Sequence, residues 1–253
     1  MHFIRITFKN TLAYRWNVFF SLLGSITVIA VNLLLWQFLY RDDPAMVSYM
    51  VKYVVLANFI TLFYSQDMCW VLGDKVRDGS FATDLIKPVN IFFMSWQVVL
   101  GEMLSNFVVR GIPTILVYVG FLIANPGYHN IVWALLAVVL GHILYLLMYS
   151  LVGFATFVVI ESWTFWRLLT ETIKLFAGAF VPLAIMPGWL HSVAMALPFR
   201  FLFSFPLELL LGTADMSQLP ANFLTMLLWI AAFSVFNILA YKGALRKTVI
   251  QGG

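Results

Sequence analysis

Charged side chains are scarce in this sequence: they make up 10% of its 253 residues, whereas 62% of the residues are hydrophobic. A soluble domain typically carries about 25% charged residues, and a water-soluble fold of this length could not hide so much apolar surface. The hydrophobic residues also gather in long runs. These features exclude a soluble globular domain and predict an all-α membrane protein with one transmembrane domain over residues 1–253.

Cysteine and the common catalytic motifs are also nearly absent. Cys69 is the only cysteine, which excludes an internal disulfide framework and a multi-cysteine metal site. The nearest approach to a phosphate-binding loop, Gly73 to Gly79-Ser80, has the wrong spacing and no lysine after its second glycine, and no H-E-x-x-H motif occurs. We therefore expect this chain to hold no catalytic residue, metal or cofactor, to be no enzyme by itself, and to bind no nucleic acid.

Five apolar runs are long enough to cross about 30 Å of hydrocarbon as helices. A sixth run, 163–187, is weaker because its first half carries Arg167, Glu171 and Lys174. The predicted spans are 17–40, 48–72, 97–124, 131–160, 163–187 and 219–241. The first run is too long for a cleavable signal. The residues before it have polar and apolar sides and predict an N-terminal interfacial helix.

Helix-breaking residues divide the segment 187–219, which is otherwise apolar enough for a seventh span. These residues are Pro187, Pro198, Pro206 and Gly212. Proline removes a backbone donor and interrupts a helix, and each remaining piece is too short to cross a bilayer. We expect two short helices, 189–197 and 199–211, that are re-entrant or lie in one interface between spans five and six.

The distribution of lysine and arginine sets the orientation of the spans. With six spans, Arg41, Lys52 and Arg200 lie on the outer side. The basic residues on the cytoplasmic side are Arg5, Lys9, Arg15, Lys75, Arg77, Lys87, Arg167, Lys174, Lys242, Arg246 and Lys247. A seventh span would move the last three outside and remove most of this bias. We predict a multi-pass protein of the plasma (inner) membrane, with both termini and the loop 73–92 in the cytoplasm.

Two ionisable residues, Glu102 and Arg110, fall inside the third predicted span, where charge is costly and marks a candidate functional site. Eight residues separate them, so they lie about two turns apart on one helix face. One interpretation is that they line a translocation path. The other is that they form structural ion pairs with another helix, for instance through Asp67, Glu161 or Glu171. Both interpretations stay open.

The loop 73–92 has more pattern than a positively charged topological anchor requires. Phe81 and Leu85 are four residues apart, so a short helix places them on one face. Gly79 permits a tight turn before such a helix, and Pro88 ends it. We expect an exposed apolar pair on a short cytoplasmic helix, which suits docking on a soluble partner.

Two stretches resemble one family of transport proteins. The loop sequence Arg77-x-Gly79 followed by Leu85-x-Lys87-Pro88 resembles that of type-2 ABC exporter permeases. A second stretch is similar to the family's passage from the fifth span into short outer helices. It comprises Gly178, Pro182-Leu183, Pro187-x-Trp189-Leu190, Leu197-Pro198-Phe199, Pro206 and Gly212. The resemblance covers essentially the whole chain in length and in the order of spans.

The resemblance implies the membrane subunit of an ATP-driven exporter. Such permeases pair with a second permease, identical or homologous, and recruit separate ABC ATPase subunits that bind ATP and Mg. It implies that the ATPase-coupling residues are Arg77, Gly79, Phe81, Leu85, Lys87 and Pro88. It also implies that the residues shaping the outer helices are Pro187, Trp189, Pro198 and Phe199.

A proton-coupled secondary carrier is the alternative, with Asp67, Glu102 or His142 as the protonated group. Such carriers are built from repeats, often inverted, with their coupling-ion sites near the midplane of the membrane. The sequence shows no internal repeat. A neighbouring gene for an ATPase would favour the exporter.

Overall fold

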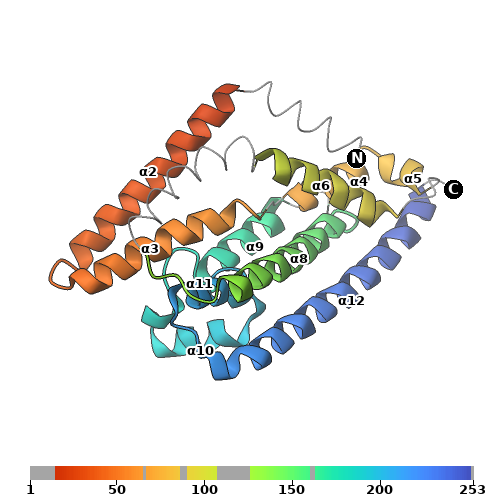
Figure 1. The fold of residues 1–253 in the computed structure, drawn as a ribbon. Coiled ribbons are helices and arrows are strands. Elements are labelled where there is room, and N and C mark those ends of the chain that lie inside the picture. Colours follow the sequence, from red (N-terminus) through yellow and green to blue (C-terminus); the bar gives the residue numbers. More distant parts are fainter. Residues whose placement is uncertain (1–14, 65–66, 86–89, 107–125, 160–162, 252–253) are drawn as a thin grey trace.

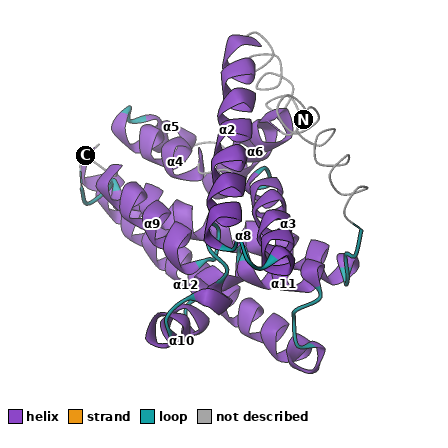
Figure 2. Cartoon of the chain, turned by 90° about the vertical axis from the view of Figure 1, so that its left-hand side faces the viewer, coloured by secondary structure: helices purple, strands orange, loops and turns teal. Residues whose placement is uncertain are grey.

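A computed structural model describes residues 15–64, 67–85, 90–106, 126–159 and 163–251 of the chain (Figures 1 and 2). The regular secondary structure of these residues is helical. The predicted interfacial helix before Arg15 lies outside these residues. The α-helices are α2 (Arg15–Leu39), α3 (Pro44–Thr61), α4 (Asp67–Arg77), α5 (Ser80–Asp84), α6 (Ile91–Asn106), α8 (Ile131–Ala155), α9 (Trp163–Phe176), α10 (Gly188–Ala196), α11 (Ser204–Leu211) and α12 (Leu219–Gln251). Three short 3-10 segments in the described residues are η2 (Leu183–Ile185), η3 (Pro198–Phe201) and η4 (Met216–Gln218).

Helix α8 lies at the centre of the fold, with α4, α9, α11 and α12 packed against it (Figure 1). Every residue from Leu144 to Ser150 is buried, so this part of α8 is enclosed on all sides. Helix α4 approaches α8 closely at Gly153, where a Cβ would lie 2.8 Å from the Cβ of Leu72. By contrast, only 11% of the apolar window of α12 is buried, so this chain leaves most of the apolar surface of α12 uncovered.

By length and hydropathy, three described helices can cross a membrane, namely Pro44–Thr61, Ile131–Ala155 and Met216–Arg246. Shorter apolar helices cover Ala30–Leu39 and Ile91–Gly101. The structure is therefore that of an all-helical membrane protein. Most of the third predicted span, 97–124, lies outside the described residues.

The second predicted span, 48–72, contains two helices instead of one, because α3 ends at Thr61 and α4 begins at Asp67. No proline or glycine lies between them, so local helix propensity does not explain the break. A side chain from a distant helix binds the backbone there instead. The Nδ1 atom of His142 lies 2.6 Å from the carbonyl oxygen of Phe63. A carbonyl only accepts, so Nδ1 carries the hydrogen.

The fifth predicted span, 163–187, is helical only as far as Phe176, and Gly178 then takes a φ of 77°. A 14-residue helix rises about 21 Å, which is less than the roughly 30 Å of hydrocarbon. Irregular backbone continues from its end. There, the amide of Ser204 donates to the carbonyl of Ala177 at 2.9 Å, which satisfies a group that lipid could not.

The two short helices predicted after this span are present as α10 and α11, with η3 between them. Pro187 stands directly before α10, and Pro198 opens η3 with a fixed φ that suits a first helical position. Gly212 ends α11 with a φ of 73°, a left-handed conformation that glycine adopts without strain.

Candidate coupling element and central cavity

A tight turn joins α4 to α5. Gly79 adopts a φ of 75° there, which a residue with a Cβ would adopt only with strain. The Asp78 carboxylate accepts a 2.8 Å hydrogen bond from the backbone N–H of Ser80. Hydrogen bonds from the Ser80 hydroxyl and from this amide hold the pKa of Asp78 below its ordinary value. The turn therefore fixes the direction in which α5 leaves α4.

The side chain of Phe81 anchors α5 to the rest of the chain. Phe81 is only 2% exposed, and its ring packs edge-on against Phe157 at 4.8 Å and against Tyr241 of α12 at 6.5 Å. Tyr241 in turn lies 6.1 Å from Phe154 near the end of α8. In Figure 1, α5 lies beside the C-terminal end of α12. The short helix is thus docked on the ends of α8 and α12.

An ion pair makes the second connection of α5. The Lys75 ammonium of α4 lies 2.7 Å from the Asp84 carboxylate of α5, and the two side chains are 16% and 7% exposed. Because the pair is largely shielded from water, it is less screened than a surface pair. It ties the end of α5 back to α4.

Phe81 and Leu85 share a face, but that face points inward. Leu85 is partly buried and packs against the same core as Phe81. The exposed apolar pair predicted from the sequence is therefore wrong: Phe157 and Tyr241, which are distant in sequence, cover the Phe81 ring. The exposed surface of this element is polar and small, and is made by Asp78, Gly79, Ala82 and Thr83.

The remaining residues of the predicted coupling set are placed in part. Arg77 is exposed, with its guanidinium 2.7 Å from the Asp74 carboxylate and 5.9 Å from the Trp70 ring. Lys87 and Pro88 lie outside the described residues.

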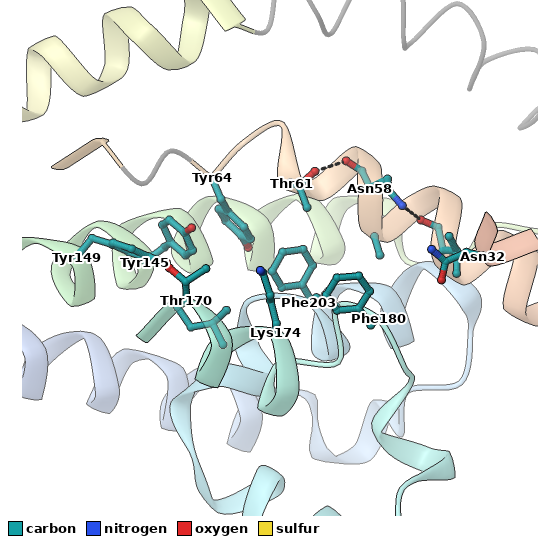
Figure 3. A pocket seen from close by; sticks show the side chains of 14 residues that line it. Asn32, Asn58, Thr61, Tyr64, Tyr145, Tyr149, Thr170, Lys174, Phe180 and Phe203 are labelled. Atoms are coloured by element: carbon teal, nitrogen blue, oxygen red, sulfur yellow. Dashed lines mark hydrogen bonds between the residues drawn. The ribbon is translucent and has the colours of Figure 1, made fainter. Parts of the chain in front are cut away.

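A cavity of about 180 Å³ lies where α3, α8 and α9 meet the segment 177–211 (Figure 3). Asn58 and Thr61 of α3 are part of its lining, as are Phe180 and Phe203 of that segment. Asn32 of α2 also contributes. The lining thus mixes aromatic rings with amide and hydroxyl groups.

Stacked rings form one wall of the cavity. Tyr64 stacks on Tyr145 at 5.0 Å with 13° between the planes, and Tyr145 lies 4.6 Å from Tyr149. Phe203 meets Tyr64 edge-on at 5.2 Å. The Tyr149 hydroxyl is hydrogen-bonded to the Thr170 hydroxyl at 2.8 Å, which connects the wall to α9. The rings are thus largely buried against one another and give this side of the cavity a fixed aromatic wall.

Lys174 brings a cation to the lining of the cavity (Figure 3). It donates to the Glu171 carboxylate at 3.0 Å, a carboxylate that also lies 3.2 Å from Arg167. These side chains are about half exposed, and such surface pairs contribute little stability. From the sequence, Arg167, Glu171 and Lys174 only lowered the hydropathy of the fifth predicted span. Helical periodicity places them on one face but does not reveal which part of the chain that face contacts.

Two tyrosines, Tyr53 of α3 and Tyr64 just after it, connect this part of the chain to the segment 177–211, and sequence reasoning missed both. The Tyr53 hydroxyl donates to the carbonyl of Gly178, and the Tyr64 hydroxyl donates to the carbonyl of Leu202, each at 2.6 Å. In a regular helix the residue four positions later supplies the donor for such a carbonyl. For Leu202 that residue is Pro206, which has no N–H.

The other predicted site residues lie apart from both features. Trp189 is 72% exposed on α10, and Phe199 stacks on Phe176 at the end of α9. Glu102 belongs to α6, of which only the backbone is described at this position, and Arg110 lies outside the described residues. The structure therefore does not bring the predicted sets together into one site.

Within the described part of the chain, no three histidine, cysteine, aspartate or glutamate residues cluster closely enough to hold a metal ion. Cys69 is buried between α4 and its neighbours. The described structure thus combines the docked α5 element with a central cavity. This combination supports binding and movement of a solute.

The sequence profile of a family described as ABC-2 family transporter protein matches residues 26–252 of this chain. Because the match covers most of the sequence, the chain belongs to the ABC-2 transporter family. It is a membrane component of an ABC transporter, a class in which the membrane subunit is typically non-catalytic and an ATPase is generally the partner. The family indicated by the loop and the outer helices is thus confirmed. No curated protein is similar enough in sequence to count as a match.

Proposed function

We propose that this chain is the transmembrane permease subunit of an ATP-driven exporter. It spans the membrane six times with both termini in the cytoplasm, and it pairs with a second permease, identical or homologous. Its energy comes from separate ABC ATPase subunits, which bind ATP and Mg and contact the segment 73–92. Family membership supports the class of protein, and the docking of α5 is the observation that carries the mechanism.

The α5 element is built to transmit a displacement. An ATPase would contact the exposed surface around Gly79, Ala82 and Thr83, while Phe81 holds the opposite side of the helix against α12 and the end of α8. The Lys75–Asp84 pair couples the same displacement to α4. Close-packed interiors transmit strain instead of absorbing it.

The displaced helices continue to the central cavity, which is the proposed translocation path. Helix α8 carries Tyr145 and Tyr149 of the ring wall, and α4 follows directly after Tyr64 and the break in the second span. The hydrogen bonds from Tyr53 and Tyr64 to the carbonyls of Gly178 and Leu202 extend the connection to the segment 177–211. Glu102 and Arg110 remain proposed contributors to the path.

Co-purification tests the contact with the ATPase. Thr83→Arg places a long charged side chain on the exposed side of α5 without touching the Phe81 anchor. The variant should insert and accumulate as the wild type does, but should lose its ATPase during purification. Gln218→Arg, at the exposed last residue of η4, is the matched control and should retain the ATPase. An unchanged yield of ATPase with Thr83→Arg, together with normal export, contradicts the proposal.

Thiol labelling tests the orientation, and the native Cys69 does not interfere because it is fully buried. Thr83→Cys and Gln218→Cys each add one exposed thiol. In intact cells an impermeant maleimide should label Gln218→Cys but should reach Thr83→Cys only after the membrane is opened. Labelling of Thr83→Cys from outside would overturn the proposed topology.

A further inference from the structure

A second hollow, separate from the central cavity, lies where α8 and α12 meet the start of α6. This groove has a volume of about 250 Å³, and its apolar walls come from Phe92 of α6, Leu147 and Phe154 of α8, and Ile238 and Tyr241 of α12. Cavities that enclose drug-sized molecules usually measure about 300–1,000 Å³. The groove, like the central cavity, is below that range, and it borders α12, most of whose apolar surface this chain leaves uncovered. Its size and position suit a narrow apolar chain.

Asn237 and Ser234, two polar residues of α12 that line the groove, are already hydrogen-bonded within the protein. The Asn237 amide donates to the carbonyls of Leu147 at 2.9 Å and Phe233 at 2.8 Å, and its oxygen accepts from the Ser150 hydroxyl. The Ser234 hydroxyl donates to a carbonyl one turn earlier at 2.7 Å. A polar ligand would find these donors in use, whereas an apolar chain needs none of them.

Positive charge lies beside one end of the groove. Lys242 follows Tyr241 and stands one helical turn after Ile238, and Arg246 stands one turn further. Both side chains are exposed, and neither forms an ion pair within the described part of the chain. Exposed cations at the end of a membrane helix attract the headgroups of anionic lipids.

We propose that this groove binds an anionic phospholipid, with one acyl chain between α8 and α12 and the headgroup phosphate at Lys242 and Arg246. The apolar walls select the chain, and the two cations select the charge. The bound chain would contact Phe154 and Tyr241, and Tyr241 packs against Phe81. A lipid in the groove therefore braces the α5 element, a consequence that rests on the proposed function, whereas the binding itself does not.

Native mass spectrometry of the purified full-length chain tests the binding, after equilibration with equal amounts of phosphatidylglycerol and phosphatidylcholine. The wild type should retain phosphatidylglycerol in preference. Ile238→Trp fills the groove and should reduce the retained lipid at least several-fold. Leu239→Trp is the matched control, because Leu239 is similarly exposed but does not line the groove, and it should behave as the wild type does. Equal retention by the two variants overturns the proposal.

The charge is tested separately. Lys242→Gln and Arg246→Gln should each lower phosphatidylglycerol retention about five-fold while leaving phosphatidylcholine unchanged. Arg41→Gln replaces an exposed cation in the turn between α2 and α3, and it should change the retention of neither lipid. Unaltered phosphatidylglycerol retention in the double glutamine variant, or an equal loss of both lipids, overturns the proposal. Because no ATPase is present in this measurement, its outcome is independent of the co-purification test.

Discussion

Removing the Phe81 ring is the sharpest test of how α5 is held. Truncating a fully buried phenylalanine to alanine typically costs about 3–5 kcal/mol. Helix α5 has five residues, and an isolated helix of that length is not stable, so the loss falls on the docking of α5. A cost of 3 kcal/mol changes the ratio of docked to released helix by about two orders of magnitude. Phe81→Ala should therefore release α5 while the membrane helices stay in place.

Hydrogen exchange and coupled transport measure this release. In the complex with its ATPase, amides of residues 80–84 should exchange much faster in Phe81→Ala than in the wild type. The ATPase should still bind through the exposed surface, but the amount of solute exported per ATP should fall. Gln218→Ala alters an exposed residue of η4, outside the proposed ATPase contact, and should match the wild type in both measurements. Native exchange rates and native export per ATP in Phe81→Ala would refute the anchoring role.

Three further outcomes are expected. Tyr53→Phe leaves the buried carbonyl of Gly178 without its donor, so it should lower stability by about 1–3 kcal/mol, seen as a lower midpoint of thermal unfolding in detergent. Gly153→Ala places a Cβ 2.8 Å from a neighbouring side chain and should lower that midpoint, whereas Gly243→Ala, with open space around it, should not; equal effects would contradict the close packing of α4 on α8. Lys174→Met removes the cation from the cavity and should change which solutes are exported in a transport assay, while ATPase co-purification stays normal.

Composition and helix breakers predicted much of the fold. Long apolar runs of high hydropathy correspond to α8 and α12. Pro187, Pro198 and Gly212 separate the two short outer helices at the predicted places. These predictions succeed because they depend on local properties: backbone donors, allowed φ values and the length of a run.

The break between α3 and α4 and the inward orientation of α5 depend on distant contacts, and so they were not predictable from local patterns. Tyr64 binds a carbonyl 138 residues away, and no local signal marks that pairing. Helical spacing correctly predicted that Phe81 and Leu85 share a face. It could not predict that Tyr241, 160 positions later, would cover that face. The cavity has the same origin, since its lining residues come from several helices that are distant in sequence.

The hydrogen bonds from Tyr53 and Tyr64 also bear on the order in which the chain enters the membrane. The carbonyls of Gly178 and Leu202 lie in backbone that leaves them without regular helical donors, and an unpaired carbonyl costs several kcal/mol in hydrocarbon. Their donors, Tyr53 and Tyr64, are synthesised 125 and 138 residues earlier. The segment 177–211 therefore gains stability when α3 and Tyr64 are already in place, so we expect the first half of the chain to serve as the template on which the second half is assembled.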